Sequence, residues 1–350
     1  MIVSTTITNS RADVIRAALT EIAPHVDYAI VIDTGATDDT MEIAADVLGP
    51  KLVAVRWPWQ NDFAAARNFA LAEAKQFLRA RRELLRQAPE PAGGDPSDWI
   101  VTADTDEWLR IPGAREFLAT VPAEFDAVMV PHYSGTYQQC RCIRATCKGQ
   151  WAMPVHEYFH PYRSVQPPKG WEFQCQLRPD EDRTAKYEHY RAVLEALVER
   201  EPDNARAFYY LGDTLAILGY KGAAIKAFSR CGELPGWNEQ ASWARYRAAV
   251  LQFELGLGTH AIETCVQGIA RSPTMAELYW LAGWIYYQGQ NWRAAANFAE
   301  AACRIGPKPR AGFCFPAAQK ELPEQLLRFA QAQLAGRPIE GAPKPAARPA

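Results

Sequence analysis

The sequence predicts an α/β domain with a mostly parallel sheet, followed by an all-helical repeat domain. Two observations indicate this: apolar strand-like and helical segments alternate over about the first 160 residues, and from about residue 187 alanine-rich helical segments recur at fixed spacing. With 350 residues, 48% of them hydrophobic, the chain is long enough for two cores. We expect domains at residues 1–183 and 184–335, and a disordered Pro/Ala-rich tail at 336–350.

The composition and charge of the chain argue against a generally basic nucleic-acid-binding protein and a membrane-spanning protein. The formal net charge of −2 argues against a generally basic nucleic-acid binder. No segment approaches the roughly 18 apolar residues of a membrane span, and the N-terminal stretch lacks the pattern of a secretion signal, so we expect a cytoplasmic protein. Eight cysteines in such a chain are expected to be reduced. Four of them could bind zinc, although ordinary buried thiols fit their spacing better: Cys140, Cys142, Cys147 and Cys175.

Strands and helices alternate in the first domain. The apolar, β-branched runs predict strands, and segments with helical spacing of apolar residues lie between them. Such alternation is typical of a largely parallel sheet with helices as crossovers. The expected strands are 2–8, 28–32, 52–56, 100–103 and 127–131, the expected helices are 12–22, 41–48 and one from 64 onward, and a hairpin is expected within 133–147.

A cluster of carboxylates follows the fourth expected strand. Asp104, Asp106 and Glu107 come directly after residues 100–103, and in open α/β sheets ligands bind beyond the carboxyl ends of the strands. Two aspartates one residue apart offer hard oxygen ligands to a Mg²⁺ or Mn²⁺ that also binds a diphosphate. The alternative is a solvated acidic turn.

Large and small residues recur at fixed offsets in the second domain. Leu211-Gly212 and, 16 residues after Gly212, Phe228 correspond to Leu281-Ala282 and Phe298, and about 70 positions separate Gly212 from Ala282. This spacing equals about two repeats of about 34 residues, which is the tetratricopeptide pattern. We therefore expect about three repeats, with residues 322–334 as a terminal cap and a surface suited to a protein partner or to self-association.

Three segments of the first domain resemble one known family. They are Asp33-Thr-Gly-Ala-Thr-Asp-Asp-Thr, Asn61-Asp-Phe-Ala-Ala-Ala-Arg67-Asn68 and Asp98-Trp-Ile-Val-Thr-Ala-Asp104-Thr-Asp106-Glu107. In this order they are similar to the family 2 glycosyltransferases, and most similar to the bacterial β-glucosyltransferase-like branch that carries C-terminal tetratricopeptide repeats. The resemblance implies a GT-A fold and inverting sugar transfer without a covalent intermediate.

The resemblance also implies roles for individual residues. Asp33 would hold the base or ribose of the nucleotide, Arg67 would reach the nucleotide from its helix, and Asp104 would contact ribose or metal. Asp106 would be the main metal ligand. Thr8 would line the base pocket, although the turn that begins there departs from the family pattern. A helix cap for Asp33 and a surface ion pair for Arg67 are the alternatives.

A His-Glu pair is the candidate for the reaction itself. Relatives carry a similar Val-His-Glu element, so the resemblance implies that His156 completes the metal shell or binds the diphosphate and that Glu157 takes the proton of the acceptor. The alternative is a structural hydrogen-bonding pair. The acidic run 180–182 is a second source of the base, although the start of a helix explains it better.

The predicted function is metal-dependent hexosyl transfer from a UDP-sugar, UDP-glucose or UDP-N-acetylglucosamine, with Mn²⁺ or Mg²⁺ as cofactor. The acceptor stays open among a glycan, a protein side chain and modified nucleic acid, and the basic insertion 75–97 does not choose among them. The alternative is a catalytically inactive, nucleotide-sugar-binding TPR interaction protein. Nucleotidyl transfer would use an early Gly-rich phosphate loop, and the sequence shows none.

Overall fold

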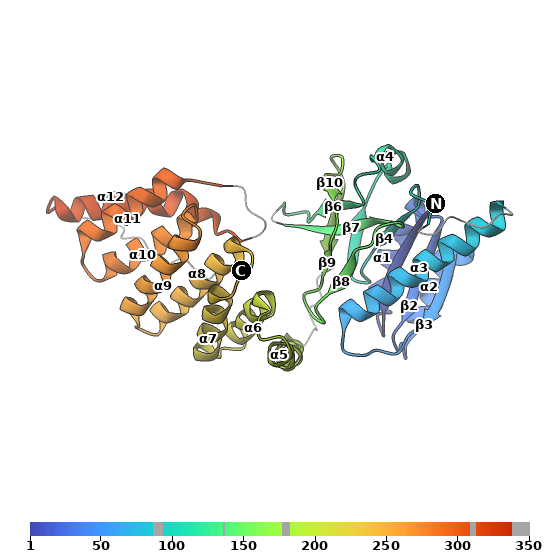
Figure 1. Cartoon of the computed structure of the whole chain (residues 1–350), viewed down its shortest axis with the longest axis horizontal. Coiled ribbons are helices and arrows are strands. Elements are labelled where there is room, and N and C mark those ends of the chain that lie inside the picture. The colour runs from blue at the N-terminus through green and yellow to red at the C-terminus, as the bar shows by residue number, and fades with distance from the viewer. Residues whose placement is uncertain (87–93, 136, 177–182, 309–312, 338–350) are drawn as a thin grey trace. The chain divides into compact units, whose positions relative to one another are not determined.

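The chain forms two compact units, Met1–Glu181 and Asp182–Ala350. The computed structural model describes residues 1–350 except 87–93, 136, 177–182, 309–312 and 338–350 (Figure 1). The acidic run 180–182, part of the basic insertion and most of the predicted tail lie outside the described residues. The sequence predicted domain limits at 183 and 184, and these limits stay a prediction.

A mixed sheet forms the centre of the first unit. Its order is β10-β6-β7-β4-β1-β2-β3. β1 pairs in parallel with β2 and β4, and β2 with β3, whereas β7 is antiparallel to both β4 and β6. β10 pairs in parallel with β6, so six of the seven strands run in one direction and β7 runs against them, as predicted for a mostly parallel sheet. The seven strands are β1 (Ile2–Thr8), β2 (Tyr28–Asp33), β3 (Leu52–Arg56), β4 (Trp99–Thr102), β6 (Ala127–Pro131), β7 (Gln138–Arg144) and β10 (Ser164–Val165).

Helices and two small ribbons complete this unit. β5 (Glu107–Arg110) pairs with β11 (Glu172–Cys175), and β8 (Gln150–Ala152) pairs with β9 (Tyr158–His160). The helices are α1 (Ile15–Ile22), η1 (Ala23–His25), α2 (Thr40–Leu48), η2 (Gly49–Lys51), α3 (Phe63–Arg86) and α4 (Ala114–Thr120).

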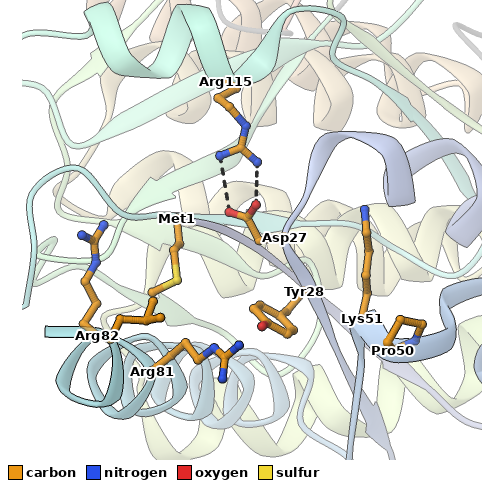
Figure 2. A pocket seen from close by; sticks show the side chains of 9 residues that line it. Met1, Asp27, Tyr28, Pro50, Lys51, Arg81, Arg82 and Arg115 are labelled. Atoms are coloured by element: carbon orange, nitrogen blue, oxygen red, sulfur yellow. Dashed lines mark hydrogen bonds and ion pairs between the residues drawn. The ribbon is translucent and has the colours of Figure 1, made fainter. Parts of the chain in front are cut away.

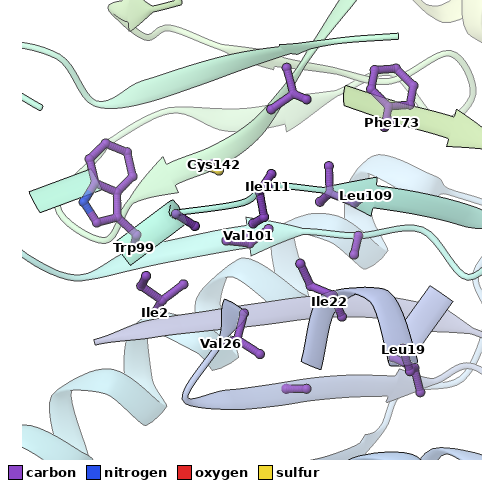
Figure 3. Packing of buried hydrophobic residues seen from close by; sticks show 14 of the residues in the cluster. Ile2, Leu19, Ile22, Val26, Trp99, Val101, Leu109, Ile111, Cys142 and Phe173 are labelled. Atoms are coloured by element: carbon purple, nitrogen blue, oxygen red, sulfur yellow. The ribbon is translucent and has the colours of Figure 1, made fainter. Parts of the chain in front are cut away.

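Two apolar layers cover the sheet. Successive side chains of a strand point to opposite faces, so Ile2 and Val101 contribute to one layer while Val3 contributes to the other. The first layer packs against α1, and Figure 3 shows Leu19 and Ile22 of that helix facing the strand residues. The second layer is covered by α3, a helix of 24 residues. Helices thus cover both faces and leave the ends of the strands as the accessible edge.

The structure corrects the expected hairpin within 133–147. Residues 138–144 form the single strand β7, which pairs with β6 and β4. Cys140, Cys142 and Cys147 are buried free thiols there, and Cys175 is exposed. No group of three His, Cys, Asp or Glu side chains suited to a metal occurs among the described residues, so the four cysteines are not assembled as a zinc site.

The second unit consists of helical hairpins. Among the described residues, α6 with α7, α8 with α9 and α10 with α11 form three successive hairpins, and α12 packs on α11 and α10 (Figure 1). This confirms the predicted helical repeats and cap. Gly212 of α6 explains the close approach within the first hairpin, because an added Cβ would lie 2.7 Å from the Phe228 ring. The helices are α5 (Arg183–Arg200), α6 (Ala205–Ile217), α7 (Lys221–Glu233), α8 (Asn238–Glu254), α9 (Gly258–Arg271), α10 (Ala276–Gln288), α11 (Trp292–Ile305), η3 (Pro316–Gln319) and α12 (Glu321–Leu334).

Candidate functional site

The predicted binding residues meet at the carboxyl edge of the parallel strands. β1 lies between β4 and β2, and Thr8 and Asp33 are register partners at the ends of β1 and β2. Asp104 follows β4 two residues after its last residue, Thr102. Thr8 is buried, and its hydroxyl donates to the carbonyl oxygen of Asn9 at 3.0 Å. The ends of β1, β2 and β4 thus lie at one edge of the sheet, and the binding roles of these residues stay predictions.

Asp33 organises the turn that follows β2. Its Oδ1 accepts hydrogen bonds from the backbone N–H groups of Gly35 at 2.9 Å and Ala36 at 2.7 Å. The φ of Gly35 is 130°, a conformation that L side chains rarely adopt. These bonds stabilise the turn and not the helix α2, whose N-cap is Asp39, so Asp33 is not the helix cap given as the alternative. The predicted contact of Asp33 with a nucleotide stays a prediction.

Arg67 joins two of the predicted acidic residues. It lies on α3, and its Nη2 is 2.6 Å from Asp104 Oδ1 while its Nε is 2.7 Å from Glu157 Oε1. The guanidinium also lies over the Trp151 ring, 4.9 Å from the ring centroid. Arg67 is thus held by ion pairs and an aromatic face, and its side chain is only 10% exposed, so these are not the surface ion pair that the sequence offered as the alternative.

Arg141 is a second cation at this edge, and the sequence interpretation missed it. It lies on β7 with 1% side-chain exposure, donates to Asp104 Oδ2 at 3.1 Å and to Glu107 Oε1 at 2.6 Å, and lies 4.7 Å from the Phe173 ring centroid. The sequence did contain a signal for this residue, because Arg141 lies between two cysteines within an apolar strand, and a buried positive charge requires a negatively charged partner.

The network shifts the pKa values of its members in opposite directions. Burial raises the pKa of Asp104, but the positive charges of Arg67 and Arg141 outweigh it and hold that pKa below its usual range. Burial raises the pKa of Glu107 to about 7 against the attraction of Arg141. For Arg67, burial lowers the pKa and the attraction of Asp104 and Glu157 raises it by more. Both ends of the Arg67–Asp104 pair therefore stay charged at neutral pH.

The loop that carries His156 and Glu157 has an uncommon backbone. Met153 and His156 have positive φ values of 73° and 55°, in the left-handed region that non-glycine residues rarely occupy. The loop is held to the start of α3, where the Phe63 N–H donates to the Pro154 carbonyl at 2.8 Å. Glu157 is paired with Arg67, so the carboxylate predicted as a base is a structural partner here.

The three predicted metal ligands do not fit a resident divalent cation. Both carboxylate oxygens of Asp104 accept from guanidinium groups, and two positive charges so close oppose a cation at the same oxygens. Asp106 lies in the turn between β4 and β5, where its carbonyl accepts from the Gln176 N–H at 2.6 Å. The described residues also contain no suitable group of three ligands, with His156 included.

Calorimetric titration with Mn²⁺ tests this interpretation. We expect no saturable heat of binding for the wild-type protein, because Arg67 and Arg141 occupy the Asp104 carboxylate. In Arg67→Met, one oxygen of Asp104 and the Glu157 carboxylate lose their cation, so this variant is the one expected to gain weak Mn²⁺ binding. Saturable binding by the wild type that Asp104→Asn abolishes would contradict the expectation.

A separate open pocket lies at the opposite, amino ends of the same strands. It has a volume of about 630 Å³, and Figure 2 shows Lys51, Arg81 and Arg115 among its lining residues. Lys51 donates to two backbone carbonyls, Arg115 is paired with Asp27 at 2.7 Å, and Arg81 lies over the Tyr28 ring. These cations stabilise the local structure, so the basic lining alone does not define an anion site.

The first helices of the three hairpins form a second candidate surface, which we call the first-helix face. On α6 it includes Tyr209, Asp213 and Ile217, whose spacing of four places them on one side of a helix. α8 contacts both α6 and α10. The first-helix face also includes Trp243, Arg247 and Glu254 of α8, and Glu277 and Trp280 of α10.

An open pocket of about 180 Å³ lies where α6, α7 and α8 meet. We call it the first-helix pocket. Ile217 lines it with 53% of its surface exposed. Two ion pairs fix its walls: Arg247 Nη1 is 2.5 Å from Asp213 Oδ1, and Lys221 Nζ is 2.7 Å from Glu254 Oε2. The pocket combines an exposed apolar side chain with charged groups that are already oriented.

The chain resembles tetratricopeptide (TPR) repeat proteins. It is 33% identical over 110 residues to a TPR repeat-containing protein of Synechococcus elongatus, a match that covers 31% of this chain. The chain spans only about a fifth, 21%, of the length of that relative. No family model matches the chain. No described helix is both long enough and apolar enough to cross a membrane.

The chain is also similar to parts of three solved structures, two of which are described as TPR proteins. MamA of Desulfovibrio magneticus RS-1 has a TM-score of 0.34 at 18% identity, covering 44% of this chain and 87% of that one. YrrB, described as a TPR protein with an unusual peptide-binding site, has a TM-score of 0.31 at 23% identity, covering 35% and 62%. A thermophilic TPR protein of Thermus thermophilus has a TM-score of 0.31 at 19% identity, covering 43% and 81%.

These findings overturn the predicted enzyme. The curated protein that the chain resembles is a TPR repeat-containing protein, and no family model, of a glycosyltransferase or otherwise, matches the chain. The structure supplies a physical reason, since the predicted base Glu157 and the predicted ligand Asp104 are neutralised by arginines. Hexosyl transfer was therefore the wrong prediction, and the UDP-sugar and manganese assignments that accompanied it lack support. The alternative of a TPR interaction protein without transfer activity agrees better with the findings.

Proposed function

We propose that this protein is an interaction protein that binds an extended segment of a partner protein on its first-helix face. The first-helix pocket is the observation that carries the proposal. Its 180 Å³ can receive one apolar side chain against the exposed Ile217. Stacked helical repeats present continuous surfaces of this kind, along which a peptide contacts several repeats.

The charges around the pocket favour a peptide over a small apolar ligand. Arg247 and Lys221 both line the pocket, and each is paired with a carboxylate. Burial raises the pKa of Asp213 although Arg247 opposes this shift. Oriented charged groups of both signs beside an apolar hollow can pair with the backbone and flanking side chains of a peptide, and such groups give specificity more than affinity.

Panning of a displayed peptide library against the full chain tests the proposal. Ile217→Asp places a charge in the first-helix pocket, and we expect it to weaken the enriched peptides by about tenfold or more. Val266→Asp is the matched control, because Val266 on α9 is 48% exposed and does not line the pocket. Fluorescence anisotropy gives the affinities. Equal affinities for the two variants would show that the peptides bind elsewhere.

For the first unit we propose the GT-A layout as the finer description of the fold, without sugar transfer. The parallel order β4-β1-β2-β3 and the carboxylates that follow β4 support it. The binding roles assigned to Thr8, Asp33, Arg67 and Asp104 stay predictions.

A further inference from the structure

A short segment of the chain lies on the first-helix face. Phe313 comes after α11 in the chain, yet its ring contacts side chains of the two earlier hairpins. Its centroid lies 5.3 Å from that of Tyr209 on α6, 5.0 Å from Trp237 at the start of α8 and 6.4 Å from Trp243. Only 9% of Phe313 is exposed. The ring is therefore buried among aromatic side chains contributed by hairpins other than its own neighbours α10 and α11.

The next aromatic residue of this segment contacts the third hairpin. Phe315 lies 5.9 Å from Trp280 of α10 in an edge-to-face arrangement. Its backbone is extended, and its N–H donates to Glu277 Oε1 at 3.2 Å. The side-chain amide of Gln319 donates to the same oxygen at 2.9 Å. Glu277 is fully buried. The segment thus supplies hydrogen-bond donors to a carboxylate that has no access to water.

Residues 313–315 contact the repeat surface as a bound peptide would, and the short helix η3 begins directly after them. Two aromatic anchors two residues apart occupy neighbouring hairpins, and a buried carboxylate binds the backbone between them. A backbone N–H is present in every residue except proline, so another peptide could supply the same donor. Only the aromatic contacts therefore depend on which side chains the bound peptide carries.

We propose that residues 313–319 are an internal ligand of the first-helix face, and that the external ligand is a partner peptide with two aromatic side chains two residues apart that displaces them. This inference rests on the proposed function and names the chemistry of the partner. An internal ligand competes at an effective concentration of about millimolar. The partner peptide must therefore exceed the segment in affinity or in local concentration before it binds.

A labelled copy of the segment is the probe for this competition. The peptide carries the sequence of residues 313–320 with serine in place of the cysteine, and its anisotropy is measured with the full chain. We expect the variant Phe313→Ala/Phe315→Ala, which leaves the two aromatic sites vacant, to bind the peptide about tenfold or more tighter than the wild type does. Adding Trp243→Ala should abolish this gain, and a peptide with both phenylalanines changed to alanine should not bind. A folded Phe313→Ala/Phe315→Ala variant that fails to bind would overturn the proposal.

Hydrogen exchange on the wild-type protein provides a test that needs no variant. The backbone N–H of Phe315 should exchange through local opening, faster than the amides of α8 and α10, because the segment leaves while the hairpins stay folded. Exchange of Phe315 only together with those helices would show that the segment is a fixed part of the core and would overturn the proposal. If library peptides bind without accelerating this exchange, the proposed function stands and the internal-ligand inference fails.

Discussion

Replacing Arg141 with methionine is expected to lower the free energy of unfolding of the first unit by about 3–5 kcal/mol. The guanidinium is 1% exposed and pairs with Glu107 and Asp104. Its removal leaves these two carboxylates with less positive charge to offset the cost of their burial. Arg110→Ala is the control: Arg110 also forms two ion pairs, but it is 51% exposed, and we expect a loss of less than about 1 kcal/mol. Scanning calorimetry of the full chain measures both.

The loss caused by Arg141→Met should depend on pH. Burial already raises the pKa of Glu107 to about 7 in the presence of Arg141, and without this cation the pKa rises further. The folded state then binds a proton that the unfolded state releases above its ordinary pKa, so stability falls as pH rises. The variant should lose more stability at about pH 8 than at about pH 5. An equal loss at both values would contradict the role of Glu107.

Replacing Phe228 with alanine is expected to destabilise the second unit by about 3–5 kcal/mol. Phe228 is fully buried between α6 and α7, with its ring against Gly212 and 5.9 Å from the Tyr209 ring. Its removal leaves a cavity at the closest approach of the first hairpin. Urea unfolding followed by circular dichroism measures the change. The exposed substitution Val266→Ala should change stability by less than about 0.5 kcal/mol.

A paired substitution separates packing from hydrophobicity at this contact. Gly212→Ala alone would place a methyl group 2.7 Å from the Phe228 ring and should cost about 1–3 kcal/mol. Gly212→Ala with Phe228→Leu gives the methyl group room, so the double variant should lose less than the sum of the single losses. Strict additivity would show that the two side chains do not meet as described.

The periodic parts of the fold were predictable, because their signals are local. The strands that became β1, β2 and β3 lie within about two residues of their predicted bounds, and the spacing of Leu211, Gly212 and Phe228 predicted the helical hairpins. The place of β7 was not predictable in this way. Its pairing with β4 joins segments about forty residues apart. The local sequence of residues 138–144 does not indicate that this strand lies between β4 and β6.

The candidate site was predictable in position and wrong in chemistry. Asp33 and Asp104 converge because parallel strands end at one edge of the sheet. The partners in the ion pairs come from distant parts of the chain: Arg67 lies 37 residues before Asp104, Arg141 lies 37 residues after it, and Glu157 lies 90 residues after Arg67. Motif residues carry no information about such distant counter-charges, and these ion pairs decide whether a carboxylate can bind metal or accept a proton.

The hydrogen bond between Phe315 and Glu277 restricts how a ligand can be positioned on the first-helix face. In the internal segment the donor is the N–H of Phe315 at 3.2 Å. The following residue, Pro316, has no N–H to offer. If the segment slid by one residue, proline would face the buried carboxylate and this bond would be lost. Proline thereby excludes one of the two neighbouring registers of the segment, and partner peptides with proline in the Phe315 position should be excluded whatever their aromatic side chains.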